Sequence, residues 1–322
     1  MYKDLKLEKG MYHITNKSFT EVLESMDPSG QYAETPLAGL DAYERQLKRF
    51  DIRVSGLHCD RVEKFFSTTD SAVLFPEFIR RTIRSGVEQS VLSNIVAVQT
   101  RSESGEYQSA VLNDATAYST KTTQGNTLPT ATYLAAASTS RLEKYGRTIH
   151  ASYEAVRRQR LDSFGTILRA VGVRLANGIL VQAVQKMEAN AGSLVGVQTT
   201  GTLTYADLTK LYGSFKEFNM NTVLAAPAIA AKVMALDQMT EMASVQPNMI
   251  MLPFGAQLCK CAGMSEGYMI GLDDKFGLEM ITNGDLLLET DKIIDSQLDV
   301  ITVSLCVAFR VIMEDAVHVL SL

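Results

Sequence analysis

The stretch SAVLNDATAYSTKTTQGNTLPTATYLAAASTS, residues 109–140, contains 12 serines or threonines and only two charged residues, Asp114 and Lys121. It has too few apolar residues to form a core of its own, and too few charges for an ordinary disordered tail. A structureless insertion of this length is uncommon inside a compact domain. The stretch therefore predicts a lattice protein, in which neighbouring copies of the chain hold this polar segment in place.

The chain as a whole has the composition of a globular protein. Its 322 residues are 46% hydrophobic, enough for two domains or for one elongated body with insertions. No apolar run approaches the roughly 18–20 residues of a membrane span, and residues 1–19 lack the apolar core of a signal peptide. Cys59, Cys259, Cys261 and Cys306 form no zinc-binding pattern. We therefore expect reduced thiols and folding in a cytoplasm.

Periodicity predicts several elements in the first third of the chain. A charged helix is expected at Ala42–Phe50, and a more apolar one from about Pro76 to Val87, with its proline in the opening turn. The strand-like runs Asn94–Thr100 and Glu106–Leu112 flank the turn Ser102–Gly105. This arrangement predicts a β-hairpin between the two runs.

A long helix is predicted between Tyr153 and Glu188, because apolar residues recur at helical spacing. These residues are Val156, Leu161, Phe164, Ile167, Leu168, Val171, Leu175, Ile179, Val184 and Met187. Gly165, Gly172 and Gly178 interrupt the helix at up to about 1 kcal/mol each relative to alanine. Close packing against neighbouring elements is expected to offset this cost.

The second half predicts a mixed α/β region. Helices are expected at Tyr205–Glu217 and from Pro227 to about Leu236, with a short buried strand at Thr222–Ala226 between them. Turn residues then separate four further strand-like runs. These runs are Tyr268–Leu272, Leu278–Thr282, Leu286–Ile294 and Gln297–Met313.

In this order, the segments resemble the major capsid proteins of tailed phages, which have the Hong Kong 97 fold. The resemblance spans about residues 70–315 and depends on the order of segments, since no single motif is diagnostic. The matching segments are LFPEFIRRTI (Leu74–Ile83), IHASYEAVRRQRLD (Ile149–Asp162), LTYADLTKLYGSF (Leu203–Phe215), TVLAAPAIAAKV (Thr222–Val233) and the closing segment from Gly267 to Ile312.

The resemblance implies an α+β capsid fold with an N-terminal arm, an extended β-hairpin loop, a long spine helix, and peripheral and axial domains. The implied boundaries are 1–70 for the arm, 71–94 for the first part of the peripheral domain, 95–148 for the extended loop, 149–202 for the spine helix of the peripheral domain, 203–265 for the axial domain, and 266–322 for the return strands of the axial and peripheral domains.

One motif suggests an enzyme instead. Gly263-Met264-Ser265-Glu266-Gly267 matches the G-x-S-x-G nucleophile elbow of serine hydrolases, with Ser265 as the nucleophile. The later residues Asp273, Asp274 or Asp285 and then His318 follow in the order of that catalytic triad. The elbow requires a helix after the serine, whereas the following YMIGLDD predicts a strand. A turn between strands is therefore the preferred interpretation, and no catalytic residue is predicted.

No metal or cofactor site is predicted. Asp291, Asp295 and Asp299 form a carboxylate row, but they lack the glycine and the closing glutamate of a calcium loop. Some members of the resembled family cross-link a loop lysine to an asparagine of a neighbouring subunit. Lys121 is the one candidate lysine within residues 109–140 for such a cross-link.

The resemblance implies a structural subunit that assembles into an icosahedral shell around double-stranded phage DNA. The implied partners are other copies of the chain in hexamers and pentamers, a portal protein, scaffolding or decoration proteins, and DNA bound without sequence preference, with no membrane. The implied location is the virion capsid, after folding and assembly in the host cytoplasm. The alternatives are an encapsulin shell around cargo enzymes, a tail or baseplate protein, and the serine hydrolase.

Charge is unevenly distributed along the chain. The net charge is −5, and residues 191–322 carry −8 while residues 1–190 carry +3. Opposite charges of the two halves would favour contacts between copies. Two ordinary solvated surfaces explain the same numbers, so both interpretations stay open.

Overall fold

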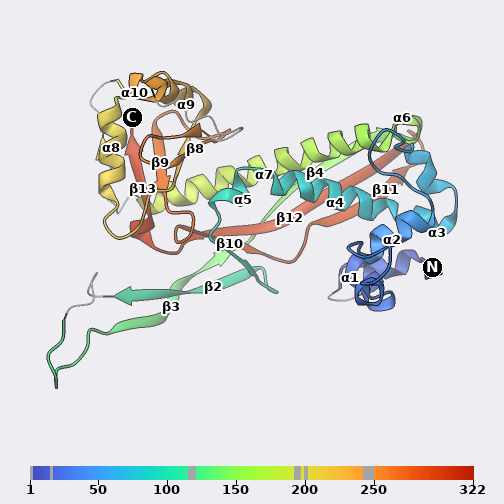
Figure 1. The fold of residues 1–322 in the computed structure, drawn as a ribbon, viewed down its shortest axis with the longest axis horizontal. Helices are drawn as coiled ribbons and strands as arrows, with labels where there is room; N and C mark the ends of the chain where they lie inside the picture. Colours follow the sequence, from blue (N-terminus) through green and yellow to red (C-terminus); the bar gives the residue numbers. More distant parts are fainter. Residues whose placement is uncertain (1–2, 15–16, 115–120, 192–196, 199–201, 242–249) are drawn as a thin grey trace. The chain divides into compact units, whose positions relative to one another are not determined.

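The computed structural model describes residues 3–14, 17–114, 121–191, 197–198, 202–241 and 250–322, and these form a mixed α+β structure (Figure 1). Contacts divide the chain into two units. The first comprises residues 1–89, 146–175 and 286–304, and the second comprises residues 90–145, 176–285 and 305–322. Helix α7 (Leu161–Ala191) and strand β12 (Leu298–Val311) contribute residues to both units.

The beginning of the first unit consists of short helices. These are η1 (Lys9–His13), α1 (Phe19–Met26), η2 (Ser29–Tyr32), α2 (Ala42–Arg49), η3 (Val62–Phe66), α3 (Thr69–Ala72) and α4 (Phe75–Glu88). Capping boxes begin three of them, with Ser18 and Glu21 at α1, Asp41 and Glu44 at α2, and Thr68 and Ser71 at α3. The region predicted as an arm is therefore helical, and it buries apolar side chains. They include Leu5, Leu7, Phe19, Val22, Leu23, Tyr43, Leu47, Val62 and Phe65.

The predicted long helix is interrupted near its start. Helix α6 (Tyr153–Arg158) is followed by Gln159, whose backbone is extended, and α7 begins at Leu161. The carbonyl of Gln159 accepts a hydrogen bond from the Val62 amide at 2.9 Å, and the Leu161 amide donates to the carbonyl of Asp60 at 2.9 Å. A single continuous helix was the wrong prediction, because pairing with residues 60–62 satisfies the backbone at the break.

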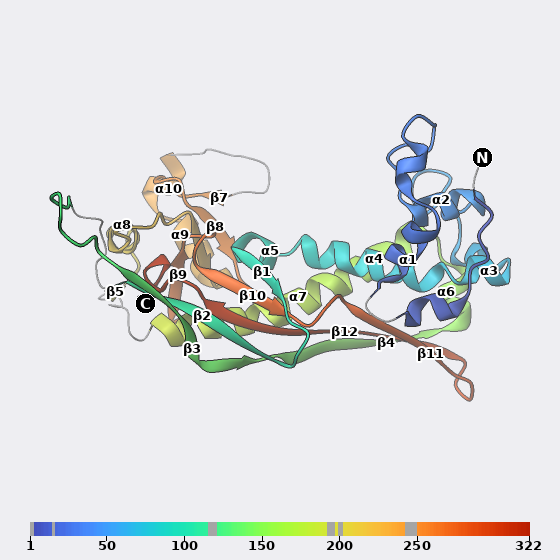
Figure 2. The ribbon, with the colours of Figure 1, turned by 90° about the horizontal axis from the view of Figure 1, so that it is seen from below.

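Helices α4 and α7 touch backbone to backbone at two glycines, and the two helices lie side by side in Figures 1 and 2. A Cβ atom on Gly172 would lie 2.1 Å from the carbonyl oxygen of Ile83, and one on Gly86 would lie 2.2 Å from the carbonyl oxygen of Arg169. The predicted reason for a glycine in the helix is thus confirmed for Gly172. It is wrong for Gly178, whose added Cβ would meet nothing within 4 Å.

We therefore expect Gly172→Ala to destabilise the protein by about 1–3 kcal/mol, because the added methyl forces the two helices apart. The matched change Gly178→Ala should stabilise it by up to about 1 kcal/mol, because alanine is the better helix former in open space. Equilibrium unfolding in urea measures both changes. Shifts of the same sign and size in the two variants would show that the close approach carries no energetic weight.

One face of α7 is buried and the other is exposed. Phe164, Leu168 and Val171 are buried, but Ile167, which shares their helical spacing, is 51% exposed and is not part of the core. By length and composition alone, Leu161–Ala189 could cross a membrane, although no such run was expected from the sequence. We interpret this segment as a core helix, because its apolar face packs on protein while Arg169 and other charged residues are exposed.

The strands of the first unit flank β12. Strand β11 (Leu287–Ile293) pairs antiparallel with β12, from Leu287 opposite Ser304 to Ile293 opposite Leu298. Strand β4 (Glu143–Ser152) also pairs with β12. A Cβ atom on Gly146 of β4 would lie 2.9 Å from the carbonyl oxygen of Val303, which explains the glycine there.

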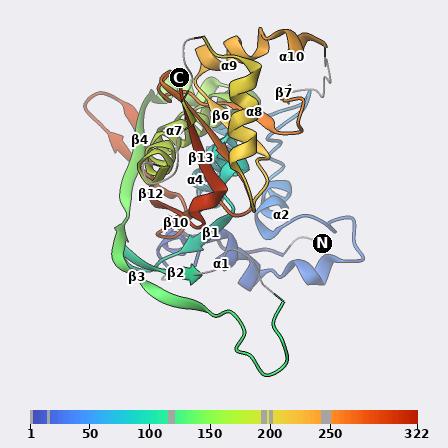
Figure 3. The ribbon, with the colours of Figure 1, turned by 90° about the vertical axis from the view of Figure 1, so that its left-hand side faces the viewer.

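The second unit is built on a six-stranded mixed sheet in the order β5-β13-β9-β6-β8-β7. Its strands are β5 (Val197–Gln198), β6 (Thr222–Ala225), β7 (Ile250–Met251), β8 (Gln257–Lys260), β9 (Tyr268–Leu272) and β13 (Val317–Ser321). The helices of this region are α8 (Tyr205–Ser214), α9 (Pro227–Met234) and α10 (Asp237–Glu241), and Figure 3 shows α8 running alongside the sheet. All four residues of β6 are buried, which places the core of the unit at this strand.

The predicted hairpin between residues 94–100 and 106–112 does not form. Strand β1 (Val98–Arg101), which follows the short helix α5 (Leu92–Ile95), pairs parallel with β10 (Leu278–Thr282) (Figure 2). Two flanking hydrogen bonds extend this pairing. The Ala97 amide donates to the carbonyl of Leu278, and the Ser102 amide donates to the carbonyl of Thr282. Strand β10 in turn pairs with β12. The prediction was wrong because the partner of β1 lies about 180 residues away in sequence.

Candidate functional site

Strands β2 (Glu106–Asp114) and β3 (Ala131–Arg141) form an antiparallel two-stranded ribbon in the second unit (Figure 2). Its pairing runs from Glu106 opposite Arg141 to Asp114 opposite Ala131. Two strands alone are at best marginally stable in water. This ribbon therefore needs support from other surfaces. Its two strands include both ends of the polar stretch 109–140.

Both faces of the ribbon carry exposed apolar pairs. Val111 lies opposite Leu134 and Leu112 lies opposite Tyr133, and because side chains alternate along a strand, the two pairs lie on opposite faces. The exposed fractions are 47% and 57% for the first pair, and 45% and 74% for the second. Contiguous exposed apolar side chains of this kind indicate an interaction surface.

A groove of about 860 Å³ lies where the ribbon meets the rest of the second unit. Its apolar lining includes Val111, Leu134, Phe218 and Met313. Glu217, Glu314 and Asp315 also line it, and all three carboxylate side chains are exposed. The groove therefore combines an apolar surface with an acidic border.

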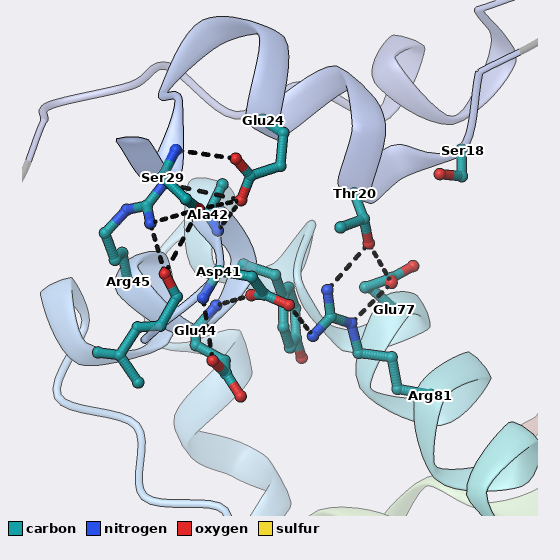
Figure 4. A network of polar contacts seen from close by, with 12 residues as sticks. Ser18, Thr20, Glu24, Ser29, Asp41, Ala42, Glu44, Arg45, Glu77 and Arg81 are labelled. Carbon is teal, nitrogen blue, oxygen red and sulfur yellow. Dashed lines mark hydrogen bonds and ion pairs between the residues drawn. The ribbon is translucent and has the colours of Figure 1, made fainter. Parts of the chain in front are cut away.

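A polar network in the first unit joins the N-terminal helices to α4 (Figure 4). Glu77 of α4 is fully buried, and its carboxylate lies 2.9 Å from Nε of Arg80 and 2.9 Å from Nε of Arg81. Thr20 of α1 donates its hydroxyl to Glu77 at 2.8 Å, and Asp41 at the start of α2 lies 2.6 Å from Arg81. Arg81 therefore connects α4 to both α1 and the start of α2, because it also donates a hydrogen bond to the hydroxyl of Thr20.

Arg45, which Figure 4 shows close to this network, forms a second buried ion pair with Asp27. Nε of Arg45 lies 2.9 Å from Asp27, and both side chains are 1% exposed. The hydroxyl of Tyr32 donates to Asp27 at 2.8 Å, and the Arg45 guanidinium lies 4.4 Å from the centre of the Tyr32 ring. Burial opposes the ionisation of nearby Glu24, but hydrogen bonds from Ser29 and from the Ala42 amide hold the pKa of Glu24 below its usual value.

The structure does not support the hydrolase alternative. Ser265 lies in the turn between β8 and β9, is followed by a strand, and accepts a hydrogen bond on Oγ from the Gly267 amide at 3.1 Å. His318 is buried on β13, with Nε2 3.1 Å from the carbonyl oxygen of Asp315, and burial lowers the pKa of its imidazole. The strand–serine–helix geometry of a nucleophile elbow is therefore absent at Ser265.

The residues of the carboxylate row do not form a cluster. Asp291 is on β11 and Asp299 on β12, in neighbouring register positions whose side chains point to opposite faces of the sheet, while Asp295 is in the connecting turn. Within the described residues, no group of three or more His, Cys, Asp or Glu side chains is placed to hold a metal ion. Lys121 is exposed. The four cysteines are unpaired, and burial raises the pKa of Cys259 to about 11.

Sequence reasoning missed the charged residues that organise these sites. Arg45, Asp27 and Glu77 belong to helices or turns that look like solvated, charged segments in the sequence. Arg310 lies within the predicted strand Gln297–Met313, which assigns it no role of its own. Its position was the available signal, because an arginine inside the apolar run of β12 requires a buried partner.

Solved structures with a similar arrangement come from capsid assemblies and a phage. The chain is similar to the capsid of a native GTA particle, with a TM-score of 0.53 and 15% identity over 74% of this chain and 90% of the other. It is similar to a chain of the satellite phage P4 procapsid including size determination (Sid) protein, with a TM-score of 0.53 and 10% identity over 75% and 89%. It is also similar to a structure from Microbacterium phage Oxtober96, with a TM-score of 0.51 and 14% identity over 72% of this chain and 90% of the other.

The chain has the Hong Kong 97 capsid fold. No protein-family model and no curated protein matches the sequence. The assignment of the capsid fold therefore depends on three-dimensional similarity, and it confirms the fold class that the order of sequence segments predicted.

Proposed function

We propose that this protein is the major capsid subunit of a tailed phage, and that its copies assemble into an icosahedral shell around double-stranded DNA. The observation that carries the proposal is the β2–β3 ribbon, whose apolar pairs are exposed on both faces. The Hong Kong 97 capsid fold supports it, because solved chains with this fold come from capsids. The role is structural.

Weak contacts repeated many times suffice for such a shell. One apolar pair buried at an interface contributes on the order of 1–3 kcal/mol. When each subunit meets several neighbours, the contacts become effectively intramolecular and combine. In the closed, symmetric shell, the copies form hexamers and pentamers, and the ribbon of each copy contacts a neighbouring copy.

Further partners follow from the same proposal. A portal protein would occupy one vertex, and scaffolding or decoration proteins would contact the lattice during or after assembly. The packaged DNA would be held without sequence preference. Assembly would take place in the host cytoplasm, and the finished subunit would belong to the virion capsid.

Negative-stain electron microscopy of the purified protein tests the proposal. We expect closed particles of uniform size, with DNA and a portal protein in particles isolated from infected cells. Particles that instead carry a cargo enzyme would establish the encapsulin alternative, and rings or tubes would establish a tail or baseplate protein. A monomer under all salt and concentration conditions would contradict any shell. Denaturing gels of the particles show whether Lys121 is cross-linked.

A further inference from the structure

The ribbon bends at an irregularity close to its base. Gln108 lies opposite Thr139, but the next pair is Ala110 opposite Ala135, so that Ser109 faces three residues of β3. Such bulges bend a ribbon and increase its twist. The side-chain amide of Gln108 donates to the carbonyl of Ala136 within the bulge, at 3.1 Å. The bulge separates a proximal part from a distal part, 110–114 with 131–135, and the distal part carries both exposed apolar pairs.

Arg310 contacts the ribbon at this bend. Its Nη1 donates to the carbonyl oxygen of Ala110 at 2.6 Å, across 200 residues of sequence. Its Nε lies 3.2 Å from Oε2 of Glu279, which is the residue directly opposite Arg310 in the β10–β12 pairing. The other oxygen of Glu279 accepts a hydrogen bond from the hydroxyl of Thr100 at 2.6 Å. The chain Thr100–Glu279–Arg310 thus crosses β1, β10 and β12 and ends on β2.

Burial makes this connection specific. The side chains of Arg310 and Glu279 are 18% and 9% exposed, so water does little to screen their charges. A guanidinium is a rigid planar fork that can meet a carboxylate with one nitrogen and a carbonyl with another. Arg310 therefore links the backbone of the ribbon to a carboxylate that the sheet already holds in place.

We infer that Arg310 is a positioning residue that fixes the direction of the distal ribbon at the bulge, with Glu279 as its anchor. Because this rests on the proposed function, the oriented part is the surface that a second copy of the chain meets. Without the guanidinium, the distal ribbon loses its attachment to β12, and its two strands, marginally stable alone, separate more often. Its two apolar pairs are then presented to the neighbouring copy in many orientations.

Hydrogen exchange of the unassembled full-length subunit, followed by mass spectrometry, tests the inference without reference to assembly. Arg310→Met leaves Glu279 buried without its partner and can unfold the unit, so the decisive variant is Arg310→Met with Glu279→Gln. We expect amides of 110–114 and 131–135 to exchange at least roughly tenfold faster in this variant, while β6 and β9 keep wild-type protection. Arg310→Lys, which has a single cationic nitrogen, should fall between the two. Arg101→Met, at an exposed arginine of β1, is the matched control and should exchange as wild type.

Two outcomes would overturn the inference. Wild-type exchange of the distal ribbon in the double variant would show that Arg310 does not hold it. Faster exchange spread evenly over β6, β9 and the ribbon would show that Arg310 only stabilises the unit. Assembly forms a separate arm of the test, because we expect the double variant to need a several-fold higher concentration for shell formation. If the wild type forms no shells, the proposed function fails while the exchange result for Arg310 stands.

Discussion

Replacing residues 109–138 by Asn-Gly should leave the body of the protein folded and abolish shell formation. Gln108 and Thr139 lie opposite each other, so a two-residue turn of this type can join them without altering the proximal pairing. Ser109 is the one buried residue among the described positions that are removed, so the core loses little. The two exposed apolar pairs disappear entirely, and each lost 1.4 kcal/mol of contact energy weakens an association about tenfold.

Circular dichroism and a urea unfolding curve check the folding of the shortened chain, and electron microscopy and light scattering check its assembly. A matched control keeps the ribbon and changes only Val111, Leu112, Tyr133 and Leu134 to threonine, which suits strands but is less apolar. It should assemble only at concentrations well above the wild-type threshold. Closed particles of normal size from the shortened chain would refute the ribbon as the main contact. Loss of folding would mean that the core extends into residues 109–138.

Short apolar strands between turn residues were predictable to the residue. Tyr268–Leu272 and Leu278–Thr282 match β9 and β10, because buried runs bounded by turns leave little choice of conformation. Helix α4 was also predictable, since Pro76 suits an opening turn and the apolar spacing that follows is helical. In these segments, local preference and the tertiary structure agree.

Features decided by distant parts of the chain were not predictable. Strand β1 pairs with β10 instead of β2, and the helix breaks at Gln159 because residues 60–62 bind its backbone. Ile167 fits the apolar period of α7, yet no described element covers it. In the ribbon, the sequence indicated a surface for neighbouring copies, but the bulge and its contact with Arg310 depend on a register that periodicity cannot specify.

Arg45→Met should destabilise the first unit by about 3–5 kcal/mol, because it leaves the buried carboxylate of Asp27 without its partner. The guanidinium also donates to the carbonyl of Leu40 at 2.6 Å and to the hydroxyl of Ser29 at 3.0 Å, and to the Asp27 carbonyl. Methionine keeps most of the volume of arginine but satisfies none of these acceptors. Such a loss is a large part of the about 5–15 kcal/mol by which a typical protein is stable.

The double variant Arg45→Met with Asp27→Leu separates the cost of an unpaired charge from the value of the ion pair. It removes both charges, and we expect it to recover about 1–4 kcal/mol of the loss. Arg84→Met is the matched control, because Arg84 pairs with Glu88 on the exposed side of α4 and should cost about 0–1 kcal/mol. Urea unfolding, with hydrogen exchange of α1 and α2 to localise the change, measures all three. Equal stability of the Arg45 and Arg84 variants would mean that water reaches Asp27, and that the N-terminal helices are held to α4 by the Glu77 network and apolar contacts instead.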